Sequence, residues 1–425
     1  MARLIIEGKR RLSGTFRPSG NKNAALPMLA ACLLTDEPVT LRNVPDIVDV
    51  TVMCELLSSL GAAVRREQDR VTVCARGIRK RKLDEALCRR IRSSILFAGP
   101  LAARHGRAEI FPPGGDVIGR RGIETHQRGL AALGIESVRG TPHLFRRRAL
   151  HGASILLEEA SVTATENLLM AATLAPGLTT LYNAACEPHV QDLGEMLVRM
   201  GAKIRGLGSN RIEIEGVEQL GPADVTVGPD YVEAASFLAA AAATGGELRV
   251  EGAFDDVLQR VMCRGFEPLG VSWEGRADGL LLPARSRLRM KPDLPGATVK
   301  IEDGPWPALP SDLMSVALVL ATQSRGQALF FEKMFESRMY FTDRLIEMGA
   351  RIIACDPHRV IVAGPSRLHG GLVTSPDIRA GMALVIAALC ARGTTVIDNA
   401  QMIDRGYAKL DERLRALGAS IEREE

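Results

Sequence analysis

Basic side chains stand at the start of several strongly apolar segments of this sequence. Lys22 and Asn23 open SGNKNAALPMLAACLL, Arg92 opens RSSILFAGPLAAR, and Arg379 lies near the start of PDIRAGMALVIAALC. The first turn of a helix carries a partial positive charge, so Ser or Asp is stabilising there and a cation is mildly unfavourable. If several such starts face one cleft, their cations and helix dipoles together predict a binding site for a phosphate or a carboxylate.

Acidic residues precede other apolar segments. Asp230, Asp312 and Asp377 each stand just before a predicted buried helix. An aspartate at this position is usually an N-cap, whose carboxylate accepts from the first free backbone N–H groups. On position alone, capping is therefore the favoured interpretation of all three, and a catalytic role is the alternative.

Two further segments carry residues suited to anion chemistry. The segment FPPGGDVIGRRGIETH, residues 111–126, has paired prolines and glycines ahead of Asp116 and then Arg121. Such a loop can close over a site as a lid, although an ordinary surface turn with solvated arginines is the alternative. Near the end of the chain, MIDRGYAKL places Arg405 just before an amphipathic segment.

The elements that carry these residues form an internal repeat. An apolar helix, a β-rich stretch, an amphipathic helix and a closing glycine recur six times, at a spacing of roughly 70 residues. Glycine suits the left-handed position after a helix because it has no Cβ. The closing glycines are Gly61, Gly134, Gly201, Gly270, Gly349 and Gly418.

The apolar helices of the repeats predict the architecture. ENLLMAATLA, VEAASFLAAAAAT, DLMSVALVLAT and AGMALVIAALCA are apolar on nearly every side, which indicates helices buried at the centre with sheets and amphipathic helices around them. We predict an α/β (α+β) fold with two domains of three repeats each. Residues 21–229 form the first domain, and residues 1–20 together with 230–425 form the second, because Gly228 and Pro229 interrupt the pattern.

Composition limits the possible partners and location. The net charge of the 425 residues is only +4, and the eight cysteines form no CxxC or Cys/His pattern. The N-terminus lacks the apolar region of a signal peptide, and the apolar runs are shorter than the roughly 20 residues of a membrane span. We therefore expect a cytoplasmic protein without a metal or other cofactor and without a membrane partner.

A nucleic-acid-binding module is the alternative from another class. Its support is the pair of basic segments RGIRKRKLDEALCRRIR and FRRRALHG. Aromatic residues make up only 4% of the chain, which leaves few platforms for stacking bases. Solvated basic faces explain both segments, so we expect no nucleic-acid partner.

Seven segments taken together resemble the UDP-N-acetylglucosamine 1-carboxyvinyltransferase family of enolpyruvyl transferases. They are SGNKNAALP, RSSILFAGPLAAR, PPGGDVIGRR, LPSDLMS, FESRMYFTDRLIEMGA, PDIRAGMALVIAALCARGTT and IDRGYAKLDERLRALGA. They extend over essentially the whole chain and are far more specific than one short motif. The resemblance implies a pair of inside-out α/β barrels with the active site between them. It also implies transfer of the enolpyruvyl group of phosphoenolpyruvate to the 3-hydroxyl of UDP-N-acetylglucosamine, which begins peptidoglycan synthesis.

The resemblance also implies roles for individual residues. The residues that would bind phosphoenolpyruvate are Lys22, Arg92, Arg121, Arg338, Arg379 and Arg405. Those that would contact the UDP-sugar are Asn23, Arg92, Arg121, Ser161, Val162, Thr163, Asp312 and the backbone near Met334. The implied catalytic set is Lys22, Asp116, Asp312 and Arg405, with Asp312 as base for the sugar hydroxyl and Asp377 as a further acidic residue of the cleft. Which arginine binds the phosphate and which the carboxylate stays open, as does the oligomeric state.

The sequence departs from the family pattern in its predicted lid. Asp116 stands where much of the family has cysteine and some members have aspartate. A carboxyl group whose pKa is raised in a desolvated site can still relay a proton. It is a poorer target than a thiolate for alkylation by an epoxide, so we predict resistance to fosfomycin.

Further departures lie on the nucleotide side of the implied site. Leu96 replaces an expected aromatic residue, GIET at residues 122–125 replaces the usual PVDL, and Glu159 and Thr163 replace a lysine and a glycine. Glu159 would repel a diphosphate if it pointed inward. An enolpyruvyl transferase with a different nucleotide or sugar acceptor is therefore the nearest alternative. The shikimate-pathway relative is less favoured because its opening loop differs from SGNKNA.

Overall fold

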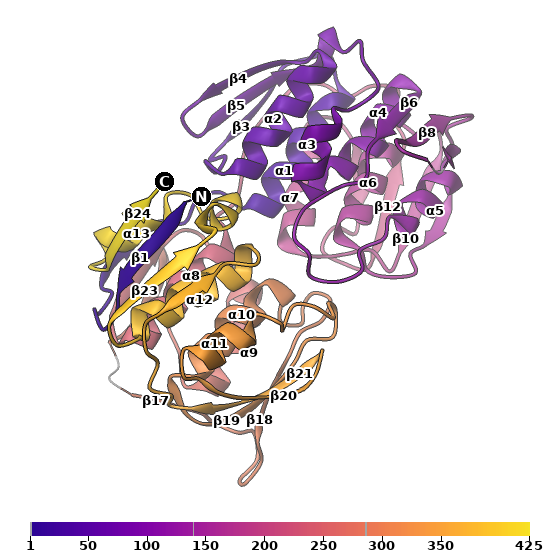
Figure 1. Cartoon of the computed structure of the whole chain (residues 1–425). Coiled ribbons are helices and arrows are strands. Elements are labelled where there is room, and N and C mark those ends of the chain that lie inside the picture. The colour runs from indigo at the N-terminus through magenta and orange to yellow at the C-terminus, as the bar shows by residue number, and fades with distance from the viewer. Residues whose placement is uncertain (1, 139, 285–286) are drawn as a thin grey trace. The chain divides into compact units, whose positions relative to one another are not determined.

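The computed structural model describes residues 2–138, 140–284 and 287–425 and divides into two compact units. The N-terminal unit comprises Gly20–Asp116 and Arg121–Gly228. The C-terminal unit comprises the segment that ends at Ser19, the short segment Val117–Arg120, and Pro229–Glu425. Figure 1 shows the elements of both units by residue number.

The N-terminal unit combines helices with three sheets. Its helices are α1 (Lys22–Ala31), α2 (Val48–Leu60), α3 (Glu85–Arg90), α4 (Ala98–His105), α5 (Glu124–Ala132), α6 (Val162–Ala172) and α7 (Pro188–Arg199), with 3₁₀ turns η1 (Cys32–Leu34), η2 (Ala75–Gly77) and η3 (Arg92–Phe97). Its strands are β3 (Val39–Arg42), β4 (Ala63–Glu67), β5 (Arg70–Cys74), β6 (Arg107–Ile110), β7 (Ile135–Val138), β8 (His143–Arg147), β9 (Ser154–Leu156), β10 (Leu178–Tyr182), β11 (Lys203–Arg205), β12 (Arg211–Glu215) and β13 (Ala223–Thr226). The sheet orders are β13-β3-β5-β4, β11-β12-β10-β9 and β6-β8-β7.

The C-terminal unit repeats this plan. Its helices are α8 (Tyr231–Thr244), α9 (Asp256–Phe266), α10 (Met314–Ala321), α11 (Thr342–Glu347), α12 (Ile378–Cys390) and α13 (Leu410–Ala416), with 3₁₀ turns η4 (Glu267–Leu269), η5 (Ser311–Leu313) and η6 (Ala400–Arg405). Its strands are β1 (Arg3–Glu7), β2 (Gly14–Phe16), β14 (Leu248–Glu251), β15 (Glu274–Arg276), β16 (Gly279–Leu282), β17 (Leu288–Arg289), β18 (Val299–Glu302), β19 (Ser324–Phe331), β20 (Arg351–Asp356), β21 (Arg359–Gly364), β22 (Leu372–Thr374), β23 (Thr394–Asp398) and β24 (Ser420–Glu424). The sheet orders are β22-β23-β1-β24, β15-β16-β14-β2 and β17-β19-β21-β20, with β18 also paired to β19.

Four of the six sheets among the described residues share one pairing pattern, which agrees with the predicted repeat. In the sheet of β9 to β12, β9 runs parallel to β10, β10 runs antiparallel to β12, and β11 pairs antiparallel with β12. The sheets that contain β3, β14 and β23 each repeat this arrangement of one parallel and two antiparallel pairs. All six predicted closing glycines adopt positive φ, between 83° and 108°. The left-handed position that the sequence predicts is therefore occupied at the end of each repeat.

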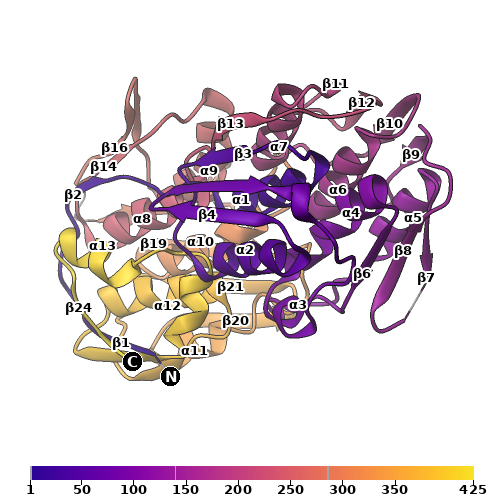
Figure 2. The same ribbon diagram turned by 90° about the horizontal axis from the view of Figure 1, so that it is seen from above.

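Apolar helices form the centre of each unit, which confirms the predicted mixed class of helices and sheets. In the C-terminal unit α8, α10 and α12 pack against one another, and Leu238, Leu318 and Leu384 on them are completely buried. In the N-terminal unit α6 packs against both α1 and α4. The view in Figure 2 shows the sheets and the amphipathic helices arranged around these central helices. The starts of the central helices carry the residues of the predicted site.

The first residues of the chain complete two sheets of the C-terminal unit. β1 pairs antiparallel with β23 and β24, and β2 pairs parallel with β14. The Phe16 ring stacks on Phe237 with centroids 3.8 Å apart, and the Arg413 guanidinium lies 4.5 Å from the Phe16 centroid while it pairs with the buried Glu233. These contacts tie the segment that ends at Ser19 to α8 and α13.

Within the part of the chain that the structure describes, no helix has both the length and the apolar character needed to cross a lipid bilayer.

Candidate active site

Lys22 is the first residue of α1 and is buried, with 7% of its surface exposed. The Asn21 side chain caps the helix by accepting from the N–H groups of Asn23 and Ala24. Lys22 Nζ lies 2.8 Å from Oδ2 of Asp49, which is also buried in the first turn of α2. The protein itself therefore supplies an anion to the cation that opens α1. A lysine has three N–H donors, so this pairing does not by itself exclude a further anion.

Arg92 opens η3, the 3₁₀ turn that leads into α4, and its NH2 group donates to the Gly122 carbonyl at 2.7 Å. The pKa of this guanidinium is lowered to about 10, mainly by burial and then by the neighbouring Arg121, while Glu124 and Glu159 oppose the change. Arg92 and Arg121 are thus close enough to repel each other. A cation pair of this kind favours an anion as a third member.

Two glycines hold the predicted loop against Arg92. A Cβ on Gly114 would lie 1.7 Å from the Arg89 carbonyl oxygen. Gly115 has φ +99°, and a Cβ there would lie 3.0 Å from the Arg92 Cβ. No other residue type fits Gly114 without movement of the backbone, so the glycines set the close approach of the half-buried Asp116 to the start of η3.

The residues predicted on the nucleotide side gather at the start of α6. Ser161 is the N-cap of α6 and accepts from the Ala164 N–H at 3.4 Å. The Thr163 hydroxyl lies 3.1 Å from Nε2 of the buried His126, and the Thr125 hydroxyl donates to Glu159 Oε1 at 3.2 Å. The departures at residues 125 and 159 therefore contact each other.

In the C-terminal unit, Asp312 is held by two arginines. Arg338 NH2 donates to Oδ1 at 3.1 Å, and Arg379 donates to Oδ2 through Nε at 3.1 Å and NH2 at 2.8 Å. Both guanidinium groups are almost completely buried, whereas 28% of the Asp312 side chain is exposed. The two arginines fix the plane of a carboxylate that still reaches solvent, which suits a group that must meet a substrate.

The capping interpretation holds for two of the three aspartates and is wrong for the third. Asp230 caps α8 by accepting from the N–H groups of Val232 and Glu233, and Asp377 caps α12 in the same way. Asp312 instead lies within η5, which Pro310 precedes and no side chain caps. Its two arginines lie far along the chain, so local sequence gives no sign of them.

Arg379 joins Asp312 to a second buried polar group. Its guanidinium lies 5.5 Å from the Tyr407 ring centroid, and the Tyr407 hydroxyl is 2.9 Å from Ser236 Oγ. Burial by itself would lower the pKa of Arg379, but Asp312, Tyr407 and Asp230 outweigh burial and raise it well above its usual value. Arg379 is therefore charged at every relevant pH.

The remaining predicted residues are partly accessible. Asn23, Arg121 and Arg405 are half-buried, Arg405 as the last residue of η6, and Met334 is 40% exposed. The Met334 N–H donates to Glu332 Oε1 at 3.3 Å. Of the predicted residues, Lys22, Arg92 and those at the start of α6 lie in the N-terminal unit. Asp312, Arg338 and Arg379 lie in the C-terminal unit, where both arginines bind Asp312.

Sequence reasoning missed three polar residues of these groups, Asp49, His126 and Glu332. Asp49 looks like an ordinary acidic residue in the first turn of an amphipathic helix, and Glu332 lies in a β-rich stretch. His126 is the last residue of the predicted loop at residues 111–126, and its position after the arginines is its only signal in the sequence. Burial and, to a smaller extent, the charge of Arg92 lower the pKa of His126 to about 3, so its ring is neutral.

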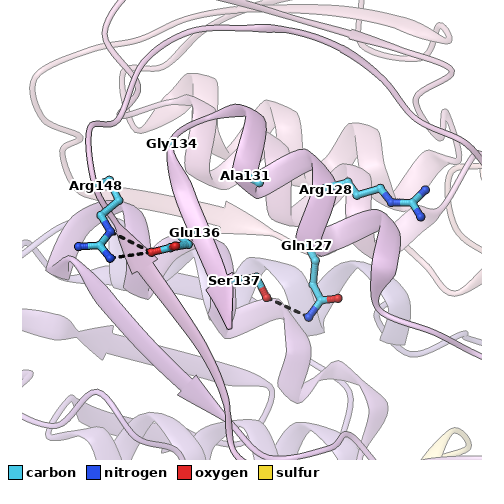
Figure 3. A pocket seen from close by; sticks show the side chains of 7 residues that line it. All are labelled: Gln127, Arg128, Ala131, Gly134, Glu136, Ser137 and Arg148. Carbon is cyan, nitrogen blue, oxygen red and sulfur yellow. Dashed lines mark hydrogen bonds and ion pairs between the residues drawn. The ribbon is translucent and has the colours of Figure 1, made fainter. Parts of the chain in front are cut away.

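A cavity of about 500 Å³ lies away from these groups, between α5 and β7 (Figure 3). Its polar side chains are bonded to one another, with Gln127 Nε2 donating to Ser137 Oγ at 2.9 Å and Arg148 paired with Glu136 at 2.9 Å. These partners leave few unbonded polar groups in the cavity for a charged substrate. Among the described residues no group of three His, Cys, Asp or Glu side chains is arranged to hold a metal ion.

Comparisons with the sequences of known proteins identify the family of this chain. The family profile described as EPSP synthase (3-phosphoshikimate 1-carboxyvinyltransferase) matches residues 6–414. The chain is 53% identical to the UDP-N-acetylglucosamine 1-carboxyvinyltransferase of Bradyrhizobium diazoefficiens, over 99% of this chain and 97% of that one. It is 48% identical to the protein of the same name from Treponema denticola, over the full length of both.

Solved structures show the same fold. The enolpyruvyl transferase NikO from Streptomyces tendae superposes with a TM-score of 0.89 at 26% identity, over 99% of this chain and 98% of that one. EPSP synthase from Acinetobacter baumannii superposes with a TM-score of 0.76 at 19% identity over the full length of both chains. The fold is that of an enolpyruvyl transferase. The chain belongs to the EPSP synthase (3-phosphoshikimate 1-carboxyvinyltransferase) family.

The buried pair of Lys22 and Asp49 predicts a large effect on stability. Asp49→Asn leaves a buried ammonium group without its counter-charge, so we expect the free energy of unfolding to fall by about 3–5 kcal/mol. The matched control is Glu215→Gln, which breaks the exposed pair with Lys203 in the same unit and should change stability little. Urea unfolding followed by circular dichroism measures both. An Asp49→Asn protein as stable as the control would contradict the pairing.

Proposed function

We propose that this protein transfers the enolpyruvyl group of phosphoenolpyruvate to the 3-hydroxyl of UDP-N-acetylglucosamine and releases phosphate, the first committed step of peptidoglycan synthesis. The observation that carries the proposal is the Asp312 carboxylate held by Arg338 and Arg379, in a chain whose full-length relatives are named for this reaction. The two compact units would then be the two three-repeat domains of an enolpyruvyl transferase.

The reaction is an addition followed by an elimination. In the addition, the sugar oxygen bonds to C2 of phosphoenolpyruvate, its proton passes to the base, and an acid protonates the methylene carbon. The product is a tetrahedral ketal that still carries the phosphate. In the elimination, the C2–O bond to phosphate breaks and a proton leaves the new methyl group, which restores the double bond. The scheme needs an acid, a base and cations that hold a multiply charged substrate.

The proposed roles follow from position and chemistry. Asp312 has an exposed edge and a fixed plane, so it is the proposed base for the sugar hydroxyl. Asp116, held near Arg92 by the two glycines, is the proposed acid for the methylene carbon. The cations proposed to bind phosphoenolpyruvate are Lys22, Arg92, Arg121, Arg338, Arg379 and Arg405. Guanidinium groups pair bidentately with both phosphate and carboxylate, and the Lys22 ammonium group offers three N–H donors to either anion.

The acceptor contacts are proposed at the start of α6. Asn23, Ser161, Val162 and Thr163 would contact the UDP-sugar, together with the backbone near Met334. An amide-rich helix start suits a diphosphate, since its first N–H groups point at the ligand.

One observation favours a second candidate, an enolpyruvyl transferase with another nucleotide or sugar acceptor. Glu159 and Glu124 both act on Arg92, and Glu159 accepts from Thr125. These carboxylates reduce the positive charge on the side proposed for the diphosphate. The fold does not distinguish between these acceptors, because EPSP synthase has the same fold.

A panel of acceptors tests the proposed function. We expect phosphate release from phosphoenolpyruvate with UDP-N-acetylglucosamine and not with UDP-glucose, UMP or shikimate 3-phosphate, because only the first offers both the diphosphate and the acetylated sugar with a free 3-hydroxyl. A coupled phosphate assay measures each rate. Release with another acceptor alone would move the reaction to the second candidate.

The aspartate at position 116 of the predicted lid predicts how the protein responds to fosfomycin. The Asp116 carboxylate reacts poorly with an epoxide, so fosfomycin should not inactivate the protein covalently. Asp116→Cys is the matched variant, and we expect it to gain time-dependent inactivation together with the added mass of one drug molecule. Activity remaining after incubation and intact-mass spectrometry measure both. Rapid inactivation of the natural protein would refute the assignment of Asp116.

A further inference from the structure

A pair of buried carboxyl groups beside Asp312 has no role in the mechanism described above. Asp303 follows β18 and Glu332 follows β19. These strands are parallel neighbours with Glu302 opposite Phe331, so the next residue of each strand arrives at the same end of the sheet. Asp303 is 1% exposed and Glu332 is fully buried. Two adjacent carboxylates without solvent would repel each other strongly.

Glu332 is bonded to several parts of the proposed site. Its Oε1 accepts from the N–H groups of Met334 at 3.3 Å and Phe335 at 3.1 Å. The Ser311 hydroxyl lies 2.9 Å from each of its two oxygens, and Ser311 directly precedes Asp312. Arg338 Nε, on the guanidinium that binds Asp312, lies 3.8 Å from Glu332 Oε2. One side chain therefore reaches both the serine beside the proposed base and the arginine that holds it.

Among the described residues one buried oxygen of the pair lacks a donor, which a proton between the two carboxyl groups would supply. Asp303 Oδ1 accepts from the Lys333 N–H at 2.6 Å. Asp303 Oδ2 is buried and has no donor among the described residues. A proton on one carboxyl group supplies that donor and removes the repulsion.

The surrounding charges agree with this assignment. Burial and a hydrogen bond with Asp303 raise the pKa of Glu332 to about 9, and the charge of Arg338 opposes the rise. His358, between β20 and β21, contacts the backbone of Glu332, with its Nδ1 2.6 Å from the Glu332 carbonyl oxygen. Lys333 points elsewhere and pairs with Glu302 at 3.0 Å.

We propose that Asp303 and Glu332 share one proton and together position Asp312 for its encounter with the acceptor hydroxyl. The pair acts through Ser311 on the backbone of η5 and through Arg338 on the carboxylate itself. Glu332 is a positioning residue, since its contacts are with protein groups. This inference rests on the proposed function for its activity measurements, but the shared proton itself can be observed without turnover.

The first test compares two replacements of Glu332. Glu332→Gln keeps an acceptor for both N–H groups and offers an amide donor to Asp303, whereas Glu332→Leu keeps similar size without either. We expect kcat to fall about 10- to 100-fold in Glu332→Leu and to be largely rescued in Glu332→Gln, because only the leucine leaves buried groups unpaired. The surface control is Glu302→Gln, which breaks only exposed ion pairs with lysines. Equal losses in the two Glu332 variants would overturn the proposal.

The pH profile of kcat adds a readout that packing alone would not change. As the pH rises through about 9, the pair loses its shared proton and two carboxylates remain beside Arg338, so kcat of the natural protein should decline. Glu332→Gln should lose this decline. Asp303→Asn removes a neighbour that raises the pKa of Glu332, so it should move the decline to lower pH. Profiles that coincide in all three proteins would overturn the positioning role.

An infrared difference spectrum detects the proton directly. We expect the natural protein at pH 7 to show a carbonyl band of a protonated carboxyl group that Glu332→Gln lacks and Glu302→Gln retains. Absence of that difference band would overturn the shared proton. If the band is present but no phosphate is released with UDP-N-acetylglucosamine, the proposed function fails while the shared proton stands. Should Glu332→Gln not fold, the pH profile of Asp303→Asn decides the proposal.

Discussion

Charges that are buried at the starts of apolar helices constrain the structure of both units of this protein. A cation there faces the positive end of the helix dipole and has lost its hydration, so a carboxylate or carbonyl group within contact distance stabilises it. Asp49 pairs with Lys22, Asp312 pairs with Arg379, and the Gly122 carbonyl accepts from Arg92. The same charges that need compensation in the free protein are suited to a substrate rich in phosphate and carboxylate groups.

The repeated architecture explains why these charges occur where they do. Each repeat contributes one helix, buried on every side, to the centre of its unit. Polar groups can reach the core at the starts of these helices without disrupting its apolar packing. Among the described residues, four of the six sheets combine one parallel pair with two antiparallel pairs. In the C-terminal unit, the parallel pair of β18 and β19 also delivers Asp303 and Glu332 to one end of the sheet, beneath the residues that hold Asp312.

Local pattern predicted the class of fold and the six closing glycines, because helix amphipathicity and left-handed turns depend on residues close in sequence. It also predicted that Asp230 and Asp377 cap helices. The partners of Lys22, Asp312 and Thr163 could not be predicted in this way. Asp49, Arg338 and His126 are 27, 26 and 37 residues away along the chain, and only the packing of whole elements brings them together. The residues implied by family resemblance remain predictions until substrates are tested.

The central claim is that the buried cations of the helix starts bind phosphoenolpyruvate. The most direct measurement is the rate of phosphate release by the double variant Lys22→Ala/Asp49→Ala, in which neither charge is left buried alone. The account predicts a protein that folds, as judged by its circular dichroism and thermal unfolding, and that turns over at least about 100-fold more slowly. A folded double variant that releases phosphate at nearly the natural rate would contradict it.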